Sequence, residues 1–204
     1  MYLDTTHLMA IAAAMGWASG LRLYAVLFLT GLAGTLGWVS LPSGLSMLQH
    51  PVVLGASGVM LAIEFFVDKI PGVDTLWDAV HTLIRIPAGA ALAAAAFGGD
   101  SSTWATAAAL LGGTLAATAH TAKATTRAAA NTSPEPFSNL GLSLLGDAAV
   151  PGMLWLAWNE PLWFFVALGL ALALAISVTY VLWRFLRGLW ARFIGAPAAP
   201  ALHG

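Results

Sequence analysis

The 204-residue sequence contains no cysteine and very few charged residues. The absence of cysteine excludes a disulfide framework, a thiolate metal site and a cysteine nucleophile. Charged residues make up 8% of the chain, whereas about a quarter of residues are charged in soluble domains. The 8 basic and 9 acidic residues nearly cancel, so the clustered positive charge that reads phosphates on nucleic acids is missing as well. We therefore expect no nucleic-acid partner.

Hydrophobic residues make up 59% of the chain, and they fall into long runs separated by Pro, Gly and polar residues. A helix needs roughly 20 mostly apolar residues to cross a bilayer. We predict an all-α, multi-pass integral membrane protein, with one helical domain at 1–188 and a cytoplasmic tail at 189–204. The predicted spans are 8–35, 51–67, 76–97, 104–130, 138–157 and 162–187. The second is short and Asp147 and Pro151 interrupt the fifth, so five spans are the alternative to six.

The positions of Lys and Arg predict the orientation, because cytoplasmic loops retain them. Arg184, Arg187 and Arg192 follow or end the last predicted span, which puts the C-terminus in the cytoplasm. Six spans then put the N-terminus in the cytoplasm too. The loops predicted on the opposite side, 36–50, 98–103 and 158–161, contain no Lys or Arg. Three spans followed by three would also allow an inverted repeat, for which a weak match at an offset of 110 residues is the only sequence support.

More than half of the charged residues lie in two windows, 64–85 and 120–147. Residues three, four or seven apart share one face of a helix, and both windows show this spacing. The first stripe is Asp74, Asp78, His81 and Arg85, and the second is His120, Lys123, Arg127 and Asn131. Glu64 and Asp68 form a further pair four residues apart, while Arg22 and Asp147 are the most isolated charges within predicted spans.

These stripes are expected to face each other inside the helix bundle, because a charge at the bilayer centre costs about 2.5–3.5 kcal/mol. We expect Glu64, Asp68 or Asp78 to pair with Lys123 or Arg127, and Arg22 and Asp147 to join them. Three alternatives stay open. Asp68, Lys69 and Asp74 would lie in a solvated loop, Lys123 and Arg127 would anchor in lipid headgroups, or the whole set would only hold helices in register.

The polar residues also carry a family resemblance. The segment from Glu64 through Asp68-Lys69-Ile70-Pro71-Gly72-Val73-Asp74 to Trp77, Asp78, His81, Arg85, Pro87 and Gly89 is one signature. Ser19-Gly20-Leu21-Arg22 is a second, and His120, Lys123, Arg127, Asn131, Ser133 to Asn139 and Ser143 form a third. Over about residues 10–180 the chain resembles the bacterial membrane family called domain of unknown function 4126. The resemblance implies an integral inner-membrane protein and supplies no activity. One departure is Gly146-Asp147, where the family pattern has an acidic pair.

The leading functional hypothesis is a transporter or channel for a small anionic solute or a lipid phosphate, coupled to protons or cations. The candidate pathway residues are Arg22, Glu64, Asp68, Asp78, His81, Arg85, His120, Lys123, Arg127, Asn131 and Asp147. The basic residues among them would bind an anion, and the acids and histidines would relay protons or cations.

Two other classes stay open beside transport. One is a membrane-embedded enzyme acting on a lipid or polyprenyl substrate through a pair such as Asp78 and His81, and the other is a scaffold subunit. No cofactor is expected, and whether some of the acids and histidines hold a metal is left open. The expected partners are the lipid bilayer, a small solute or ion and, through small-residue faces at Gly31, Gly34, Gly112 and Gly113, a second copy of the chain.

Overall fold

The computed structural model describes residues 3–70, 72–98, 102–132 and 137–194, and these contain helices and no strands. The elements are α1 (Thr5–Thr35), the 3-10 helix η1 (Ser43–Gln49), α2 (Pro51–Val67), α3 (Val73–Ala96), α4 (Ser102–Ala130), α5 (Phe137–Asn159) and α6 (Pro161–Ile194). Several predicted turn and tail residues, namely Pro71, Gly99 to Ser101, Ser133 to Pro136 and 195–204, lie outside the described residues.

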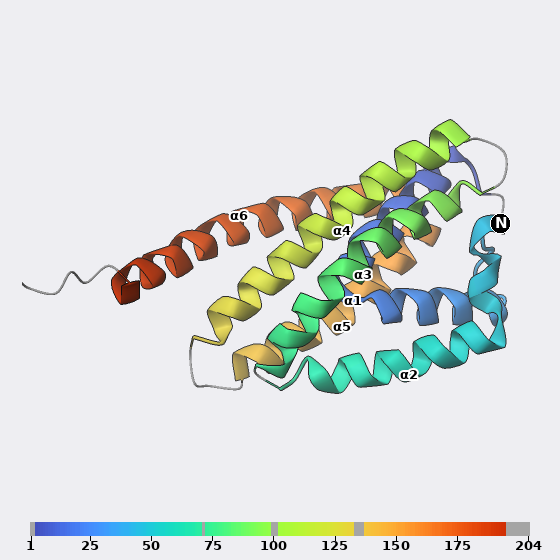
Figure 1. Ribbon diagram of the computed structural model, residues 1–204. Coiled ribbons are helices and arrows are strands. Elements are labelled where there is room, and N and C mark those ends of the chain that lie inside the picture. Colours follow the sequence, from blue (N-terminus) through green and yellow to red (C-terminus); the bar gives the residue numbers. More distant parts are fainter. Residues whose placement is uncertain (1–2, 71, 99–101, 133–136, 195–204) are drawn as a thin grey trace, which may run out of the picture.

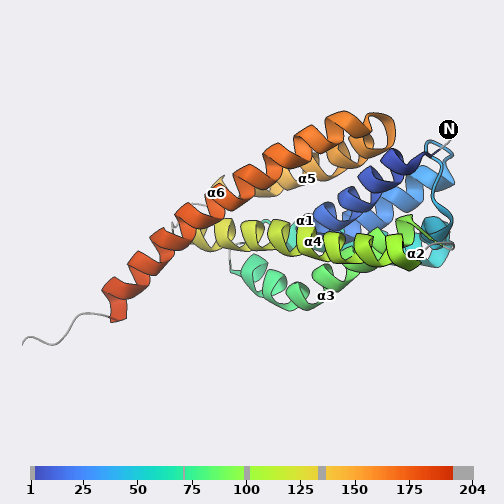
Figure 2. The same ribbon diagram turned by 90° about the horizontal axis from the view of Figure 1, so that it is seen from above.

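Helix α1 is the centre of the molecule and contacts all five other α-helices. Seen from above, α5 and α6 lie on one side of α1 and α4, and α3 lies on the other (Figure 2). Helix α2 borders the bundle along one edge, and the second half of α6 extends beyond it (Figure 1). The buried apolar core is formed largely by α1 residues, among them Ile11, Met15 and Val26, together with Val150 of α5 and Phe164 of α6.

The all-helical, membrane-type fold predicted from the sequence is confirmed. Four helical segments of the described chain are long and apolar enough to cross a membrane: Thr5–Thr35, Val73–Ala96, Phe137–Asn159 and Pro161–Ala191. A fifth results if η1 and α2, which meet at an angle of 70°, together form one bent span. The fifth predicted span is a continuous helix despite Pro151. Helix α6 continues to Ile194, so the first residues of the segment predicted as tail are helical.

Local sequence signals explain most helix ends. Asp4 caps α1 by accepting a hydrogen bond from the His7 backbone N–H at 2.8 Å, and this bond lowers the pKa of the exposed Asp4 carboxyl. Proline stands at the first position of α2 and α6, where no backbone donor is lost. Gly72 precedes α3 with φ of +86°, a conformation that side chains disfavour. Helix α2 begins at the residue predicted for the second span, whereas α1 and α3 each begin three residues, and α6 one residue, before the predicted spans.

Small residues let α1, α3 and α4 approach one another closely. A Cβ atom added at Gly112 of α4 would clash with Ala93 and Gly89 of α3, and one at Gly16 of α1 would clash with Gly112. Such contacts replace the hydrophobic driving force that is absent between helices in lipid. Three of the four glycines predicted as a dimer face, Gly31, Gly34 and Gly112, are therefore occupied by contacts within this chain, and Gly113 lies close to Ala90.

The tryptophans fall into two groups by their surroundings. Trp158 is 3% exposed and donates its indole N–H to the Ser40 carbonyl, and Trp77 stacks on the ring of His81. Trp38, Trp155 and Trp163 are exposed. A tryptophan near a helix end is thus recruited into packing when a helix neighbour lies beside it.

A buried charge network with an adjoining pocket

Ten charged residues from five helices and one turn form a single charge network inside the bundle. Its acids are Glu64, Asp68, Asp74, Asp78 and Asp147, and its bases are Arg22, Lys69, Arg85, Lys123 and Arg127. The five negative and five positive charges cancel, which lowers the cost of burying them. The network therefore carries no net formal charge.

One part, which we call the closed half, consists of Glu64, Asp78 and Arg85 with the neighbouring His120. Arg85 is 0% exposed and donates to Glu64 Oε1 at 2.5 Å and to Asp78 Oδ1 at 2.6 Å. It also donates to Nδ1 of His120 at 3.4 Å, which leaves the imidazole proton on Nε2 facing Thr82 Oγ1 at 2.7 Å. The tautomer is assigned from these contacts. All the charged groups of this half are shielded from solvent.

The other part, the pocket half, is centred on the carboxylate of Asp68, which is 0% exposed. Three cations from two helices surround it: Arg22 at 3.2 Å, Lys123 at 3.1 Å and Arg127 at 3.5 Å. Arg127 also donates to the Asp68 backbone carbonyl. The end of α2 is thereby tied to α1 and α4 through one residue.

The pocket half extends from Asp68 in two directions. Toward α5, Arg22 contacts Asp147 at 3.0 Å and donates to Ser143 Oγ at 2.9 Å, and Lys69 contacts Asp147 at 3.5 Å. Burial in the turn after α2 lowers the pKa of the Lys69 ammonium, although Asp147 acts in the opposite direction.

Toward α3, Arg127 contacts Asp74 Oδ2 at 3.0 Å, and Asn131 donates to Asp74 Oδ1 at 3.2 Å. Asp74 also accepts a hydrogen bond from the Gly72 backbone N–H at 2.8 Å. The start of α3 is thus held to the end of α4 by a carboxylate that is 0% exposed.

Lys123 joins the two halves. Its ammonium group lies 3.1 Å from Asp68 in the pocket half and 3.1 Å from Asp78 in the closed half. It also donates to the Leu21 carbonyl at 3.3 Å, directly before the point where α1 departs from helical geometry. No other side chain of the described residues forms ion pairs in both halves.

Helix α1 is broken at Arg22, where φ is −147° and ψ is 83°. A break inside a span frees backbone carbonyls, and in a membrane such groups are tolerated where the protein supplies partners. The Lys123 ammonium is the partner of the freed Leu21 carbonyl. The same break turns the Arg22 side chain toward Asp68, so it lies among the charges rather than along α1.

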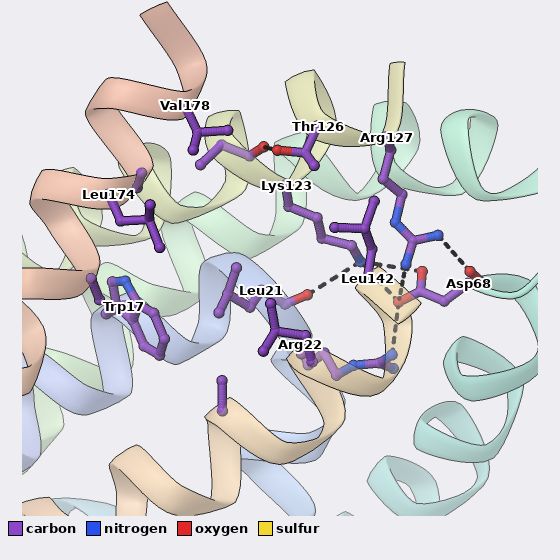
Figure 3. Close-up of a pocket in the computed structure, with 16 residues that line it drawn as sticks. Trp17, Leu21, Arg22, Asp68, Lys123, Thr126, Arg127, Leu142, Leu174 and Val178 are labelled. Carbon is purple, nitrogen blue, oxygen red and sulfur yellow. Dashed lines mark hydrogen bonds and ion pairs between the residues drawn. The ribbon is translucent and has the colours of Figure 1, made fainter. Parts of the chain in front are cut away.

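A pocket of about 370 Å³ adjoins the pocket half, between α1, α4, α5 and α6. Arg22, Lys123 and Arg127 line one end together with Asp68, as Figure 3 shows. The remaining lining is almost entirely apolar: Trp17, Leu21, Ala122, Leu142, Leu145, Gly146, Ala149, Ala171, Leu174, Ala175 and Val178, with Thr126. Leu145 and Leu174 are 66% and 64% exposed, so the pocket opens on the apolar flank of the bundle beside α5 and α6.

A second pocket of about 400 Å³ lies further along the same seam between α1 and α5. Its lining includes Thr30 of α1, Trp155 of α5 and Trp38 of the segment after α1. Along the two helices, the positions between the pockets include Val26 and Val150, both 0% exposed. The two pockets thus occupy opposite sides of an apolar barrier.

Residues 9–180 match the family described as domain of unknown function (DUF4126). The chain belongs to the DUF4126 family. No curated protein and no solved structure matches it. The match covers α1 to α5 and the first half of α6, so the charge network and both pockets lie within the family domain.

In this DUF4126 chain, the structure brings ten of the eleven predicted pathway residues into or against the network. Asp68 contacts both Lys123 and Arg127, whereas Glu64 contacts Arg85. Two of the structural alternatives do not hold for most of their residues. Asp68 and Asp74 are 0% exposed rather than solvated, although the side chain of Lys69 is 19% exposed. Lys123 and Arg127 point into the bundle rather than to headgroups.

His81 is the exception. Its Nδ1 faces the Trp77 carbonyl at 2.8 Å and its Nε2 faces the Tyr24 hydroxyl at 3.2 Å, so it forms no pair with Asp78. The Asp78 carboxylate is already held by Arg85 and Lys123. In the described part of the chain, no group of three or more His, Asp and Glu residues could hold a metal ion. The acid–base pair and the metal cluster considered from the sequence are therefore not formed.

Sequence reasoning left Lys69, Asp74 and Ser143 out of the candidate pathway set, although all three are part of the network or bind it. A signal for two of them was present. Asp74 precedes Asp78 by four residues, and Ser143 precedes Asp147 by four, so each shares a helix face with a chosen residue. The apolar lining of the pocket had no such signal, because Ala and Leu occur throughout the spans.

Proposed function

We propose that this DUF4126 protein is an inner-membrane transporter for an anionic, phosphate-bearing solute or lipid, coupled to protons or cations. The observation that carries the proposal is the break of α1 at Arg22, in the middle of a span and inside a charge network that borders an open pocket. Discontinuous helices with charged partners at mid-membrane are the usual substrate and ion sites of secondary transporters.

The two pockets on the α1–α5 seam support movement across the bilayer rather than binding alone. In the proposed cycle, the substrate passes the barrier at Val26 and Val150 when the halves of α1 shift about the break at Arg22. Protonation of a network carboxylate would release a cation for the incoming anion, which couples the two movements. The net-neutral network makes each such change costly unless a counter-charge enters.

We further propose that the N- and C-termini face the cytoplasm and that α4 and the η1–α2 pair complete six spans. Lys69, Lys123 and Arg127 then lie near the cytoplasmic side together with the Arg residues of α6, as the distribution of positive charge favours. Helix α4 is not among the helices that qualify as spans by length and composition, but its packing against α1 and α3 supports the same path through the bilayer.

The enzyme hypothesis has less support, because no histidine lines either pocket among the described residues and Asp78 and His81 are apart. A scaffold would need only separately satisfied ion pairs. It does not account for a connected network that ends at an open pocket.

The transport test uses purified protein in liposomes containing a fluorescent phosphatidic acid, with and without a pH gradient. The expected result is protein-dependent movement of the lipid between leaflets, accelerated by the gradient. Arg127→Ala should abolish it, whereas Arg184→Ala on the exposed part of α6 should leave it unchanged.

A second pair of variants tests the barrier without altering charge. Val150→Trp at the seam should stop transport, and Val166→Trp on the exposed face of α6 should not. If no phosphatidic acid, inorganic anion or proton moves through the wild-type protein under any gradient, the transport proposal is wrong.

A further inference from the structure

The first pocket has a large apolar part and a charged end, which together match a ligand with a hydrocarbon chain and a charged headgroup. Leu142, Leu145, Leu174 and Val178 offer a wall for a hydrocarbon chain, and the mouth beside Leu145 and Leu174 opens to the apolar flank. At the inner end, three cations and one carboxylate leave an excess of two positive charges. The other partners of these cations, Asp74, Asp78 and Asp147, do not line the pocket.

Two charged donors at this end have no hydrogen-bond partner. Arg22 Nη1 and Arg127 Nε are buried, on side chains that are both 2% exposed. Leaving a charged donor unsatisfied in a buried site is costly, and natural structures rarely do so without a reason. Arg85 Nε of the closed half is unpaired as well, so it is the adjoining pocket that distinguishes Arg22 and Arg127 as donors for which a ligand with acceptor oxygens would supply partners.

The surroundings of Asp68 indicate which acceptor fits. Its carboxylate lies between Arg22, Lys123 and Arg127, as a phosphate group would (Figure 3). A phosphate has more oxygens than a carboxylate and carries up to two charges, so it matches two guanidinium groups and an ammonium better than Asp68 does. Asp68 thus acts as a resident counter-ion at the headgroup position.

We infer that this pocket binds an amphiphile with a phosphate headgroup, with the phosphate among Arg22, Lys123 and Arg127 and the hydrocarbon chain between α5 and α6. The inference rests on the proposed function for its context and deepens it by assigning the class of substrate. Binding itself does not require transport, so the two are separable by experiment.

Gly146 provides a direct way to test the headgroup position. A Cβ at this residue would lie 3.4 Å from Arg22 Nε, so an aspartate there would place a second carboxylate beside Arg22. Gly141 lies on the same helix with open space around it and is the matched control. Gly146→Asp should weaken phosphate binding about tenfold or more, the ratio expected for loss of a strong charge-assisted contact, and Gly141→Asp should not.

The position of the hydrocarbon chain is tested by a second matched pair of variants, on α6. Ala175 lines the pocket, whereas Ala173, two residues earlier, is exposed and does not. Ala175→Phe should fill the apolar space and reduce binding, and Ala173→Phe should leave binding at the wild-type level. This pair does not touch the charge network, so it remains informative even if Gly146→Asp fails to fold.

The measurement is the rise in unfolding temperature of the full-length protein in a neutral detergent, titrated with phosphatidic acid, phosphatidylcholine or inorganic phosphate. We expect a clear, saturable rise with phosphatidic acid only. An equal response to phosphatidylcholine would overturn the anionic headgroup, and an equal affinity for inorganic phosphate would overturn the amphiphile. Binding that survives both Gly146→Asp and Ala175→Phe would overturn the location.

The failure of this inference differs from the failure of the proposed function. Phosphatidic acid that binds in the pocket but never moves between leaflets supports the site and contradicts transport. Transport that proceeds while Ala175→Phe and Gly146→Asp leave binding unchanged contradicts the site and supports transport by another route.

Discussion

The closed half and the pocket half of the network contain the same kinds of residue but place them in different surroundings. In the closed half, Arg85 is held between Glu64 and Asp78 and lines neither of the two pockets described above. In the pocket half, Asp68 is shared by three cations that border an open space. The difference between the halves is therefore one of surroundings rather than of residue type, since similar ion pairs lie in packed protein in one half and beside a pocket in the other.

The largest expected effect comes from removing the central cation of the closed half. Arg85→Met leaves Glu64 without its ion-pair partner in a site that is 0% exposed, and a broken buried pair costs about 3–5 kcal/mol. The free energy of unfolding, measured by denaturant titration in mixed micelles, should fall by that amount. Glu64→Leu combined with Arg85→Met should recover part of it, since an apolar replacement leaves no unpaired Glu64. A loss below about 1 kcal/mol, as at exposed pairs, would contradict the closed half as described.

Removing Lys123, which joins the two halves, should have an intermediate effect on the free energy of unfolding. Lys123→Met takes one partner from Asp68 and one from Asp78, but Asp68 keeps Arg22 and Arg127, and Asp78 keeps Arg85. A double-mutant cycle of Lys123→Met with Asp78→Asn should give an interaction energy of about 1–3 kcal/mol in unfolding experiments. If the two changes are additive, Lys123 does not join the halves energetically.

Substitutions at the edge of the pocket half should reduce stability less than substitutions in the closed half. Asp147 is 24% exposed, and Arg22 keeps Asp68 and Ser143 when Asp147 is removed. Asp147→Asn should therefore lower the free energy of unfolding by less than about 1 kcal/mol, because partly solvated pairs contribute little. A loss as large as that of Arg85→Met would erase the distinction between the two halves.

The smallest expected effect is on the pH dependence of stability and involves Lys69. Burial lowers the pKa of Lys69 below its usual 10.5, so between the folded and unfolded pKa values the unfolded chain binds more protons. The cost of burying the charged form is fully present below the folded pKa and is lost as the pH rises through 10.5. The stability of the wild type relative to Lys69→Met should thus rise slightly toward alkaline pH. A relative fall over that range would mean that Asp147 outweighs burial.

Much of the fold follows from the sequence because its signals are local. Pro51 and Pro161 mark helix starts, and the four-residue spacing of Asp74 and Asp78 marks a helix face. The break of α1 at Arg22 has only a weak local signal, the Ser19-Gly20 pair just before it, since no proline stands there. It depends on Asp68 and Ser143, which are distant in the sequence and hold the Arg22 side chain.

Helical periodicity also indicates which residues share one face of a helix, but it does not indicate which neighbouring helix that face contacts. Asp78 and His81 are three residues apart, yet Asp78 is held by Arg85 and Lys123 while His81 is held by Tyr24 and stacks on Trp77. The acid–base pair expected from spacing is therefore absent. Tyr24 of α1 is a partner of His81, and Lys123 of α4 is a partner of Asp78, so the helices that pack on α3 decided these contacts.

The sequence alone determined that the chain is a bundle of apolar helices with its charges gathered on two stripes, because both properties depend on composition and on the 3.6-residue repeat of a helix. The tertiary structure decided which charges pair, that Lys123 joins two halves, and that Arg22, Asp68, Lys123 and Arg127 are the charged residues, among those described, that line the first pocket. The physical reason is that pairing and cavity shape depend on the rotation and separation of neighbouring helices, which are set by contacts between residues far apart in the chain.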